Sequence, residues 1–126
     1  MPGKTRSHYE AKFGKGLTSD FYTYVKELEG YIAEQGWLLT KKQFNTYWCA
    51  LWFSQSEAAF GVGMKNPDLV FIYIKDVQGE SKGFLPSHII EYDPDNNQAV
   101  YSLEPGKSRT ADFAPLLKLA YERRKA

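Results

Sequence analysis

The sequence predicts an α+β domain of two layers, in which an antiparallel meander sheet of five or six strands packs against an N-terminal and a C-terminal helix. Three observations support this prediction. Two segments with helical spacing of apolar residues bracket the chain, strand-like segments fill its middle, and the intervening turns are too short for parallel crossovers. With 126 residues, the chain is long enough for one domain with its own core.

Residues 1–16 are predicted to be a basic N-terminal arm that precedes a single domain of residues 17–126. Four cations of the arm stand against one acid, Glu10. Tyr9, Phe13 and Leu17 recur at four-residue spacing, so the arm could dock its apolar side on the domain. The alternative is a free flexible tail, and the sequence leaves both possibilities open.

The first helix of the domain is expected after Thr18-Ser19-Asp20, a cluster of good N-cap residues. Apolar residues then recur at intervals of four, three and four, which is one stripe of an amphipathic helix. These residues are Phe21, Val25, Leu28 and Ile32. Gly36 is well placed to end the helix in the left-handed conformation.

Six segments in the middle of the chain are predicted strands: 37–42, 46–53, 58–62, 69–75, 84–92 and 98–103. The segments between them are rich in Asn, Asp, Pro and Ser, which favour tight turns. Pro86 cannot donate a ladder hydrogen bond, so the first part of its strand is expected at an edge or a bulge.

The last helix is expected to have Asp112 as its N-cap. This choice leaves Pro115 in the first turn, where no intrahelical donor is lost. Its packed stripe is Phe113, Leu116, Leu117, Ala120 and Tyr121. The basic residues at its end suit the helix dipole.

The segment from Tyr47 to Phe53 is apolar at every position, although a strand points alternate side chains to opposite faces. Trp48, Ala50 and Trp52 would share one face. Two helices can cover only about one face of such a sheet. The other face must therefore meet water, a partner, a ligand, the N-terminal arm, or itself through strong curling.

Composition narrows the function classes. The net charge is +1, so no global field would steer the chain to nucleic acid or to an anionic membrane. Cys49 is the single cysteine, which excludes an internal disulfide and a cysteine-rich zinc site, and its apolar surroundings predict a buried, inert thiol. The two histidines, His8 and His88, are eighty residues apart and support neither a catalytic triad nor a histidine-rich metal site.

No apolar run approaches the length of a membrane span, and the N-terminus lacks the apolar stretch of a signal peptide. We therefore expect a cytoplasmic protein that does not insert into membranes, and we expect no cofactor.

Our first functional hypothesis is a non-catalytic binding or accessory module rather than an enzyme. It would use the helix-free sheet face, with Trp48 and Trp52 as anchors, to bind a protein or a second copy of the chain. An apolar outer face motivates this hypothesis, because exposed apolar patches tend to mark interaction sites.

The alternative hypothesis is a nucleic-acid-associated domain. Lys41, Lys42, Tyr47, Trp48 and Trp52 could place cations beside rings on one surface, as single-strand binders do. Packing of a two-sided strand explains the same residues.

A third hypothesis is a metal-dependent nuclease. Pro67-Asp68, followed by Glu80-Ser81-Lys82, fits the loose acidic pattern in which two carboxylates hold magnesium and a lysine positions the attacking water. Here the second half of the pattern lies in a polar turn, whereas the chemistry needs a rigid strand end.

The order of elements also resembles known small domains. It runs from Lys41-Lys42 and the aromatic strand at Tyr47-Trp48, through 58–62 and 69–75, to the helix of residues 112–122. It resembles a small domain of unknown function found at the C-terminus of predicted transporters and in nuclease-associated proteins, and it is similar to the double-wing domains of the MmcQ/YjbR type. The resemblance spans residues 21–122 and departs from these families at 78–83 and in the arm. The similarity to the double-wing domains implies a helix–meander–helix plan, and it adds to the expectation of nucleic-acid binding, which has been proposed for that group. Neither family offers a catalytic motif.

Overall fold

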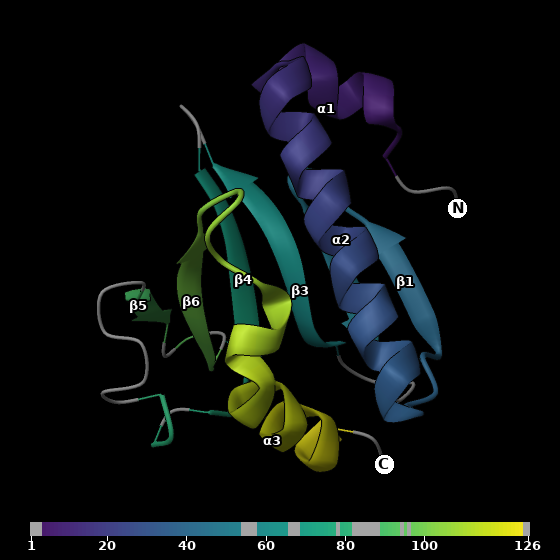
Figure 1. Ribbon diagram of the computed structural model, residues 1–126. Coiled ribbons are helices and arrows are strands. Elements are labelled where there is room, and N and C mark those ends of the chain that lie inside the picture. Colours follow the sequence, from purple (N-terminus) through teal and green to yellow (C-terminus); the bar gives the residue numbers. More distant parts are fainter. Residues whose placement is uncertain are drawn as a thin grey trace.

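The computed structural model of the chain describes residues 4–53, 58–65, 69–77, 79–81, 89–93, 95 and 97–124. Helices and strands within these residues form an α+β fold of two layers (Figure 1), which confirms the predicted fold class. The elements are α1 (Arg6–Phe13), α2 (Lys15–Gln35), β1 (Lys41–Phe44), β2 (Trp48–Trp52), β3 (Ala58–Lys65), β4 (Leu69–Lys75), β5 (Ile89–Asp93), β6 (Gln98–Leu103), the 3₁₀ helix η1 (Thr110–Phe113) and α3 (Ala114–Arg124).

The six strands form one antiparallel sheet with the order β1-β2-β3-β4-β6-β5. The first four strands are a simple meander. The order then changes, because β6 pairs with β4 and places β5 at the edge. The register of β2 and β3 shifts between Leu51 and Trp52, which pair with Phe60 and Ala58 and leave Ala59 as the extra residue of a bulge.

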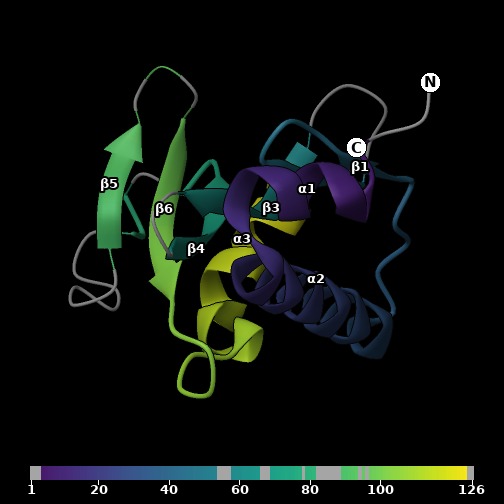
Figure 2. The same ribbon diagram turned by 90° about the horizontal axis from the view of Figure 1, so that it is seen from above.

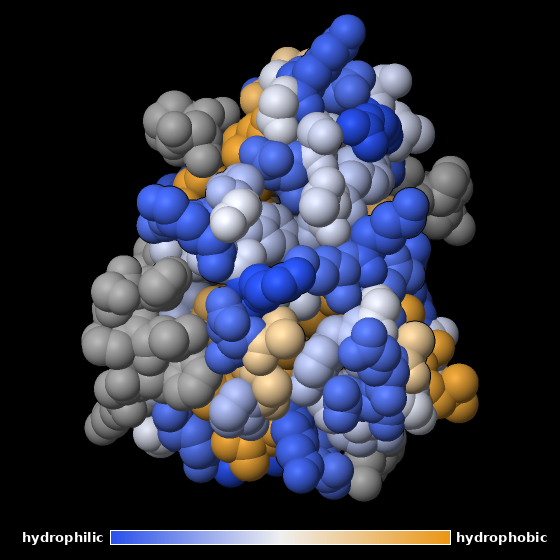
Figure 3. All heavy atoms as spheres, in the orientation of Figure 1, coloured by the Kyte–Doolittle hydropathy of each residue, from blue (hydrophilic) through white to orange (hydrophobic). Residues whose placement is uncertain are grey.

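The helices lie on one side of the sheet (Figure 1), and Figure 2 shows α2 and α3 on that same side when the molecule is seen from above. Alternate strand residues point toward them and join the buried core, among them Leu51, Val62 and Ile72. The outer surface of this helical layer is largely hydrophilic (Figure 3). The two helices thus cover one sheet face, as the sequence predicted.

The N-terminal arm is docked on the domain. Its helix α1 begins after Thr5, whose hydroxyl accepts a hydrogen bond from the His8 backbone N–H at 3.4 Å. Tyr9 is fully buried, with its ring 5.1 Å from that of Phe21, and its hydroxyl donates to the Asn45 carbonyl. Of the two possibilities that the sequence left open, docking is the one observed.

Helix α2 begins earlier than predicted. Its N-cap is Gly14, whose φ of 87° and ψ of 162° turn the chain out of α1 and directly into α2. The expected N-cap cluster at Thr18 therefore lies inside the helix, and that prediction was wrong. Gly36 does end the helix in the left-handed conformation, at φ 74°, and donates to the Ala33 and Ile32 carbonyls.

The start of α3 also differs from the prediction. Asp112 lies within η1 and accepts a hydrogen bond from the Arg109 backbone N–H at 2.9 Å, so it caps the 3₁₀ turn rather than α3. Pro115 does lie in the first turn of α3. The Tyr24 hydroxyl lies 2.9 Å from both the Glu104 and the Ser108 carbonyls, which ties the preceding loop to α2.

Strands β4 and β6 have their predicted bounds, whereas β1 begins at Lys41 instead of residue 37. Gln43 and Phe44 were expected in a turn but pair with Ala50 and Cys49, because the chain reverses in 45–47 instead. Residues 84–88, with Pro86 and His88, lie outside the described part of the chain. None of the helices within the described ranges has the length and apolar character needed to cross a membrane.

Candidate functional site

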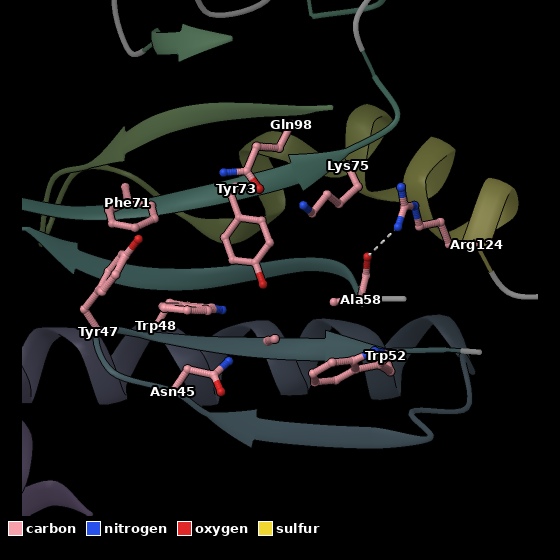
Figure 4. A pocket seen from close by; sticks show the side chains of 11 residues that line it. Asn45, Tyr47, Trp48, Trp52, Ala58, Phe71, Tyr73, Lys75, Gln98 and Arg124 are labelled. Atoms are coloured by element: carbon pink, nitrogen blue, oxygen red, sulfur yellow. Dashed lines mark hydrogen bonds between the residues drawn. The ribbon is translucent and has the colours of Figure 1, made fainter. Parts of the chain in front are cut away.

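The sheet face away from the helices holds a groove that we call the open-face groove (Figure 4). Its volume is about 450 Å³. Eleven residues line it: Asn45, Tyr47, Trp48, Ala50, Trp52, Ala58, Phe71, Tyr73, Lys75, Gln98 and Arg124. They come from β2, β3, β4 and β6, the turn before β2, and the end of α3.

Two glycines of β3 shape the floor of the groove. Gly61 pairs with Tyr73, and Gly63 pairs with Phe71. A Cβ atom at Gly61 would lie 2.6 Å from Cε2 of Tyr73, and a Cβ atom at Gly63 would clash with the Phe71 ring. Figure 4 shows Tyr73 reaching from β4 across β3. The glycines let these rings lie directly on the backbone.

The same rings cover much of the open face. Phe71, Tyr73 and Val100 are 9%, 5% and 6% exposed and form a small apolar cluster, against which Trp48 packs. Side chains of the sheet itself therefore cover part of the face that the helices leave open. Trp48 and Trp52 remain half-buried at the groove, and Tyr47 is 44% exposed.

Cations lie beside the rings. The Lys41 Nζ is 4.6 Å from the centroid of the Trp52 ring, and the Lys75 Nζ is 5.7 Å from that of Tyr73. Arg124 donates from Nη1 to the Ala58 carbonyl at 3.3 Å and from Nε to Asp76. No aspartate or glutamate is among the described residues that line the groove. The described lining is therefore aromatic and carries two basic residues, Lys75 and Arg124, of which Arg124 is ion-paired with Asp76. Lys41 adds a cation beside the lining, over the Trp52 ring.

Helix α1 fixes the turn at one end of the groove. The Asn45 carbonyl accepts from the Tyr9 hydroxyl, and the His8 Nε2 lies 3.1 Å from the Thr46 carbonyl. Within the turn, the Tyr47 ring meets the Trp48 ring edge to face, with centroids 4.6 Å apart. Docking of the arm thus positions the most exposed ring of the groove.

The predicted binding residues are divided between the two faces. Tyr47, Trp48 and Trp52 line the groove, and Lys41 lies over the ring of Trp52. Lys42 lies on the helix-facing side, where its Nζ is 3.1 Å from Oε2 of Glu29 on α2. The alternation of side chains along a strand separates the two adjacent lysines.

Sequence reasoning missed the contribution of β4. Phe71, Tyr73 and Lys75 occupy alternate positions of a strand whose bounds were predicted correctly, so the period of two could have placed them on one face. Arg124 had no comparable signal, because its place depends on how α3 crosses the sheet.

The ionisable groups near the groove favour binding over acid–base chemistry. Burial raises the pKa of the Tyr73 hydroxyl well above its ordinary value, so this group stays neutral. Burial also raises the pKa of the Cys49 thiol to about 12, and this side chain belongs to the core on the other face. Neither group is prepared to act as a base or a nucleophile.

The residues of the nuclease hypothesis are only partly described. Glu80 forms a two-pronged ion pair with Arg123, at 2.9 and 3.0 Å, which holds the pKa of its carboxyl at about 2. Asp68 and Lys82 lie outside the described residues. Within the described ranges, no group of three or more His, Cys, Asp or Glu side chains is arranged to hold a metal ion.

Comparison of the chain with protein-family models, with curated proteins and with solved structures finds no match. The resemblance to the double-wing domains therefore stays a prediction.

Proposed function

We propose that the chain is a non-catalytic binding module that holds an anionic, ring-bearing ligand in the open-face groove. One observation carries this proposal: cations and aromatic rings line the groove together, without a carboxylate among its described residues. An anionic group gains from the cations, and a planar group gains from the ring faces.

The arrangement at Trp52 illustrates the chemistry. The Lys41 ammonium lies 4.6 Å from the centre of the indole, so a ring that stacks on Trp52 would bring its charged substituent beside this ammonium. Lys75 supplies a second cation, 5.7 Å from the centroid of the Tyr73 ring, but that ring is 5% exposed and belongs to the groove floor. Trp52 with Lys41 therefore offers the apolar and the electrostatic contact, and Lys75 adds a second positive charge.

A second copy of the chain fits the groove less well than an anionic ligand. A twofold interface places the same patch of both copies face to face. The cations at and beside the groove, Lys41, Lys75 and Arg124, would then face a patch that carries the same cations, and like charges across an interface are unfavourable. Sedimentation of wild type beside Trp52→Ser tests this point, and we expect both to sediment as monomers.

A fluorescent probe tests the proposal. Anilinonaphthalene sulfonate combines aromatic rings with one negative charge, and phenylnaphthylamine carries similar rings without the charge. We expect the anionic probe to bind the folded chain, with energy transfer from Trp48 and Trp52, and the neutral probe to bind more weakly.

Lysine variants locate the site. Lys75→Gln and Lys41→Gln should each weaken binding of the anionic probe, whereas Lys118→Gln, at an exposed position of α3, should not. Circular dichroism checks that each variant is folded. Absence of probe binding, or equal binding by all three variants and wild type, would overturn the proposal.

A further inference from the structure

We infer that the ligand of the open-face groove is a single-stranded nucleic acid, an inference that rests on the proposed function. The groove offers three kinds of contact around one hollow: ring faces for bases, cations for phosphates, and amides for base edges. A polymer that repeats a ring and a negative charge in every unit matches this arrangement.

The ring faces are repeated along the groove. Trp48 and Trp52 lie on the same face of β2, four residues apart, which is about 13 Å along a strand. Figure 4 shows the Tyr73 ring, which extends from β4 across β3, between these two positions, where it forms part of the groove floor. A ligand with one ring would use a single position, whereas a strand of nucleotides uses several.

The cations lie around the same hollow. Figure 4 shows Lys75 between Tyr73 and Arg124, and Lys41 lies over Trp52 at the same end. Lys75 of β4 and Arg124 of α3 line the groove, and Lys41 of β1 lies over the ring of Trp52, which lines it too. Arg124 also forms an ion pair with Asp76, so the two lysines are the main cations that the site offers to phosphates. Phosphates between stacked bases would lie within reach of this group.

Amide side chains lie at the two sides of the groove. Asn45 precedes Trp48 on one side, and Gln98 begins β6 on the other. An amide can both donate and accept, so it can pair with the edges of bases that are not already paired. A duplex hides its base faces and edges within the stack, so a single strand is the form that uses these groups.

The charge of the site sets the strength of its salt dependence. With at most three phosphate contacts, the logarithm of the affinity for a single strand falls with the logarithm of salt concentration with a slope of about −2. Affinity should then fall about twentyfold between 50 and 200 mM salt. Such a shallow slope distinguishes this groove from a strongly basic surface, in agreement with a net charge of +1.

Fluorescence anisotropy of labelled oligothymidylate and oligouridylate tests the inference at low salt. We expect binding of at least one strand, the salt dependence given above, and displacement of bound anilinonaphthalene sulfonate by the unlabelled strand. Polyphosphate supplies charge without rings, and a duplex supplies rings that cannot be reached. Both should compete poorly.

Two variants locate the strand in the groove. Trp52→Ala should weaken binding at least about fivefold through loss of one stacking face. Lys41→Gln keeps the indole and should also weaken binding and flatten the salt dependence. The matched control is Lys42→Gln, which removes the same charge from the adjacent residue on the helix-facing side and should change little.

The outcomes separate the inference from the proposed function. If anilinonaphthalene sulfonate binds but neither oligonucleotide displaces it, the inference fails and the proposed function stands. If neither the probe nor the oligonucleotides bind, both fail. Equal competition by polyphosphate or by the duplex, or equal losses for Lys41→Gln and Lys42→Gln, would also overturn the inference.

Discussion

A single added methyl group at Gly61 tests how the floor of the open-face groove is built. In Gly61→Ala the new Cβ would lie 2.6 Å from Cε2 of Tyr73 and would also contact the Cys49 backbone carbonyl, both closer than Cβ atoms approach other atoms. The tyrosine ring could rotate away. The carbonyl cannot, because it belongs to β2, which pairs with β3.

Overpacking of this kind costs about 1–3 kcal/mol. Since one of the two contacts is with backbone, we expect the upper part of this range, about 2–3 kcal/mol. With a urea dependence of about 2 kcal/mol per molar, the midpoint of unfolding should fall by about 1 M. The assay is urea denaturation followed by far-ultraviolet circular dichroism.

Gly30→Ala is the matched control. Gly30 lies within α2, and a Cβ there meets nothing within 4 Å. Alanine should stabilise the helix by about 1 kcal/mol, so the midpoint should rise. If Gly61→Ala left the midpoint unchanged or raised it as Gly30→Ala does, the close packing around Gly61, above all its approach to the Cys49 carbonyl of β2, would be refuted.

Three further predictions concern residues outside the groove. Tyr24→Phe removes the hydroxyl that contacts two loop carbonyls and should lower the free energy of unfolding by about 1–3 kcal/mol, measured by urea denaturation; an unchanged midpoint would contradict the assigned hydrogen bonds. The Glu80 carboxyl has a pKa of about 2 in the folded chain instead of its ordinary 4.5, so its ion pair with Arg123 stabilises the fold above pH 4.5, and this contribution is lost as the pH falls toward 2. In acid titrations, the stability difference between wild type and Glu80→Gln should therefore shrink over this range, and a constant difference would argue against the pair. Cys49 is 1% exposed and has a pKa of about 12, so a thiol reagent should label it only on unfolding; rapid labelling of the folded chain would contradict its burial.

Some of the fold could be predicted from the sequence because local signals and tertiary packing agree. Residues 69–74 are apolar throughout, and with Lys75 they form β4 in the interior of the sheet. Gly36 follows the last apolar residue of a helical stripe and ends α2 as expected. In both places the local preference agrees with the tertiary arrangement.

Other elements could not be predicted because distant contacts decide them. Helix α1 is short and polar, and a helix of eight residues is not stable by itself. It forms because Tyr9 is buried beside Phe21 and bonded to Asn45, contacts that no local pattern contains. Likewise, the sequence pattern of β5 or β6 does not indicate which of the two strands pairs with β4 and which lies at the sheet edge.

The candidate site shows the same division. Trp48 and Trp52 follow from strand alternation, and the structure places both in the groove. Lys42 was grouped with them by its neighbourhood in the sequence, although alternation separates it from Lys41. The rings of Tyr73 and Phe71 lie on Gly61 and Gly63 because of the register in which β3 pairs with β4. This register cannot be read from either strand alone.

The most direct test of the binding proposal uses the indole N–H signals of the three tryptophans in a two-dimensional ¹H–¹⁵N spectrum. Trp48 and Trp52 lie in the open-face groove, whereas Trp37 stacks on Tyr121 at 4.3 Å and packs against the core of the helical side. During titration with anilinonaphthalene sulfonate, we expect shifts of the Trp48 and Trp52 signals and an unmoved Trp37 signal. A shift of Trp37 alone, equal shifts of all three, or no shift would contradict the binding proposal.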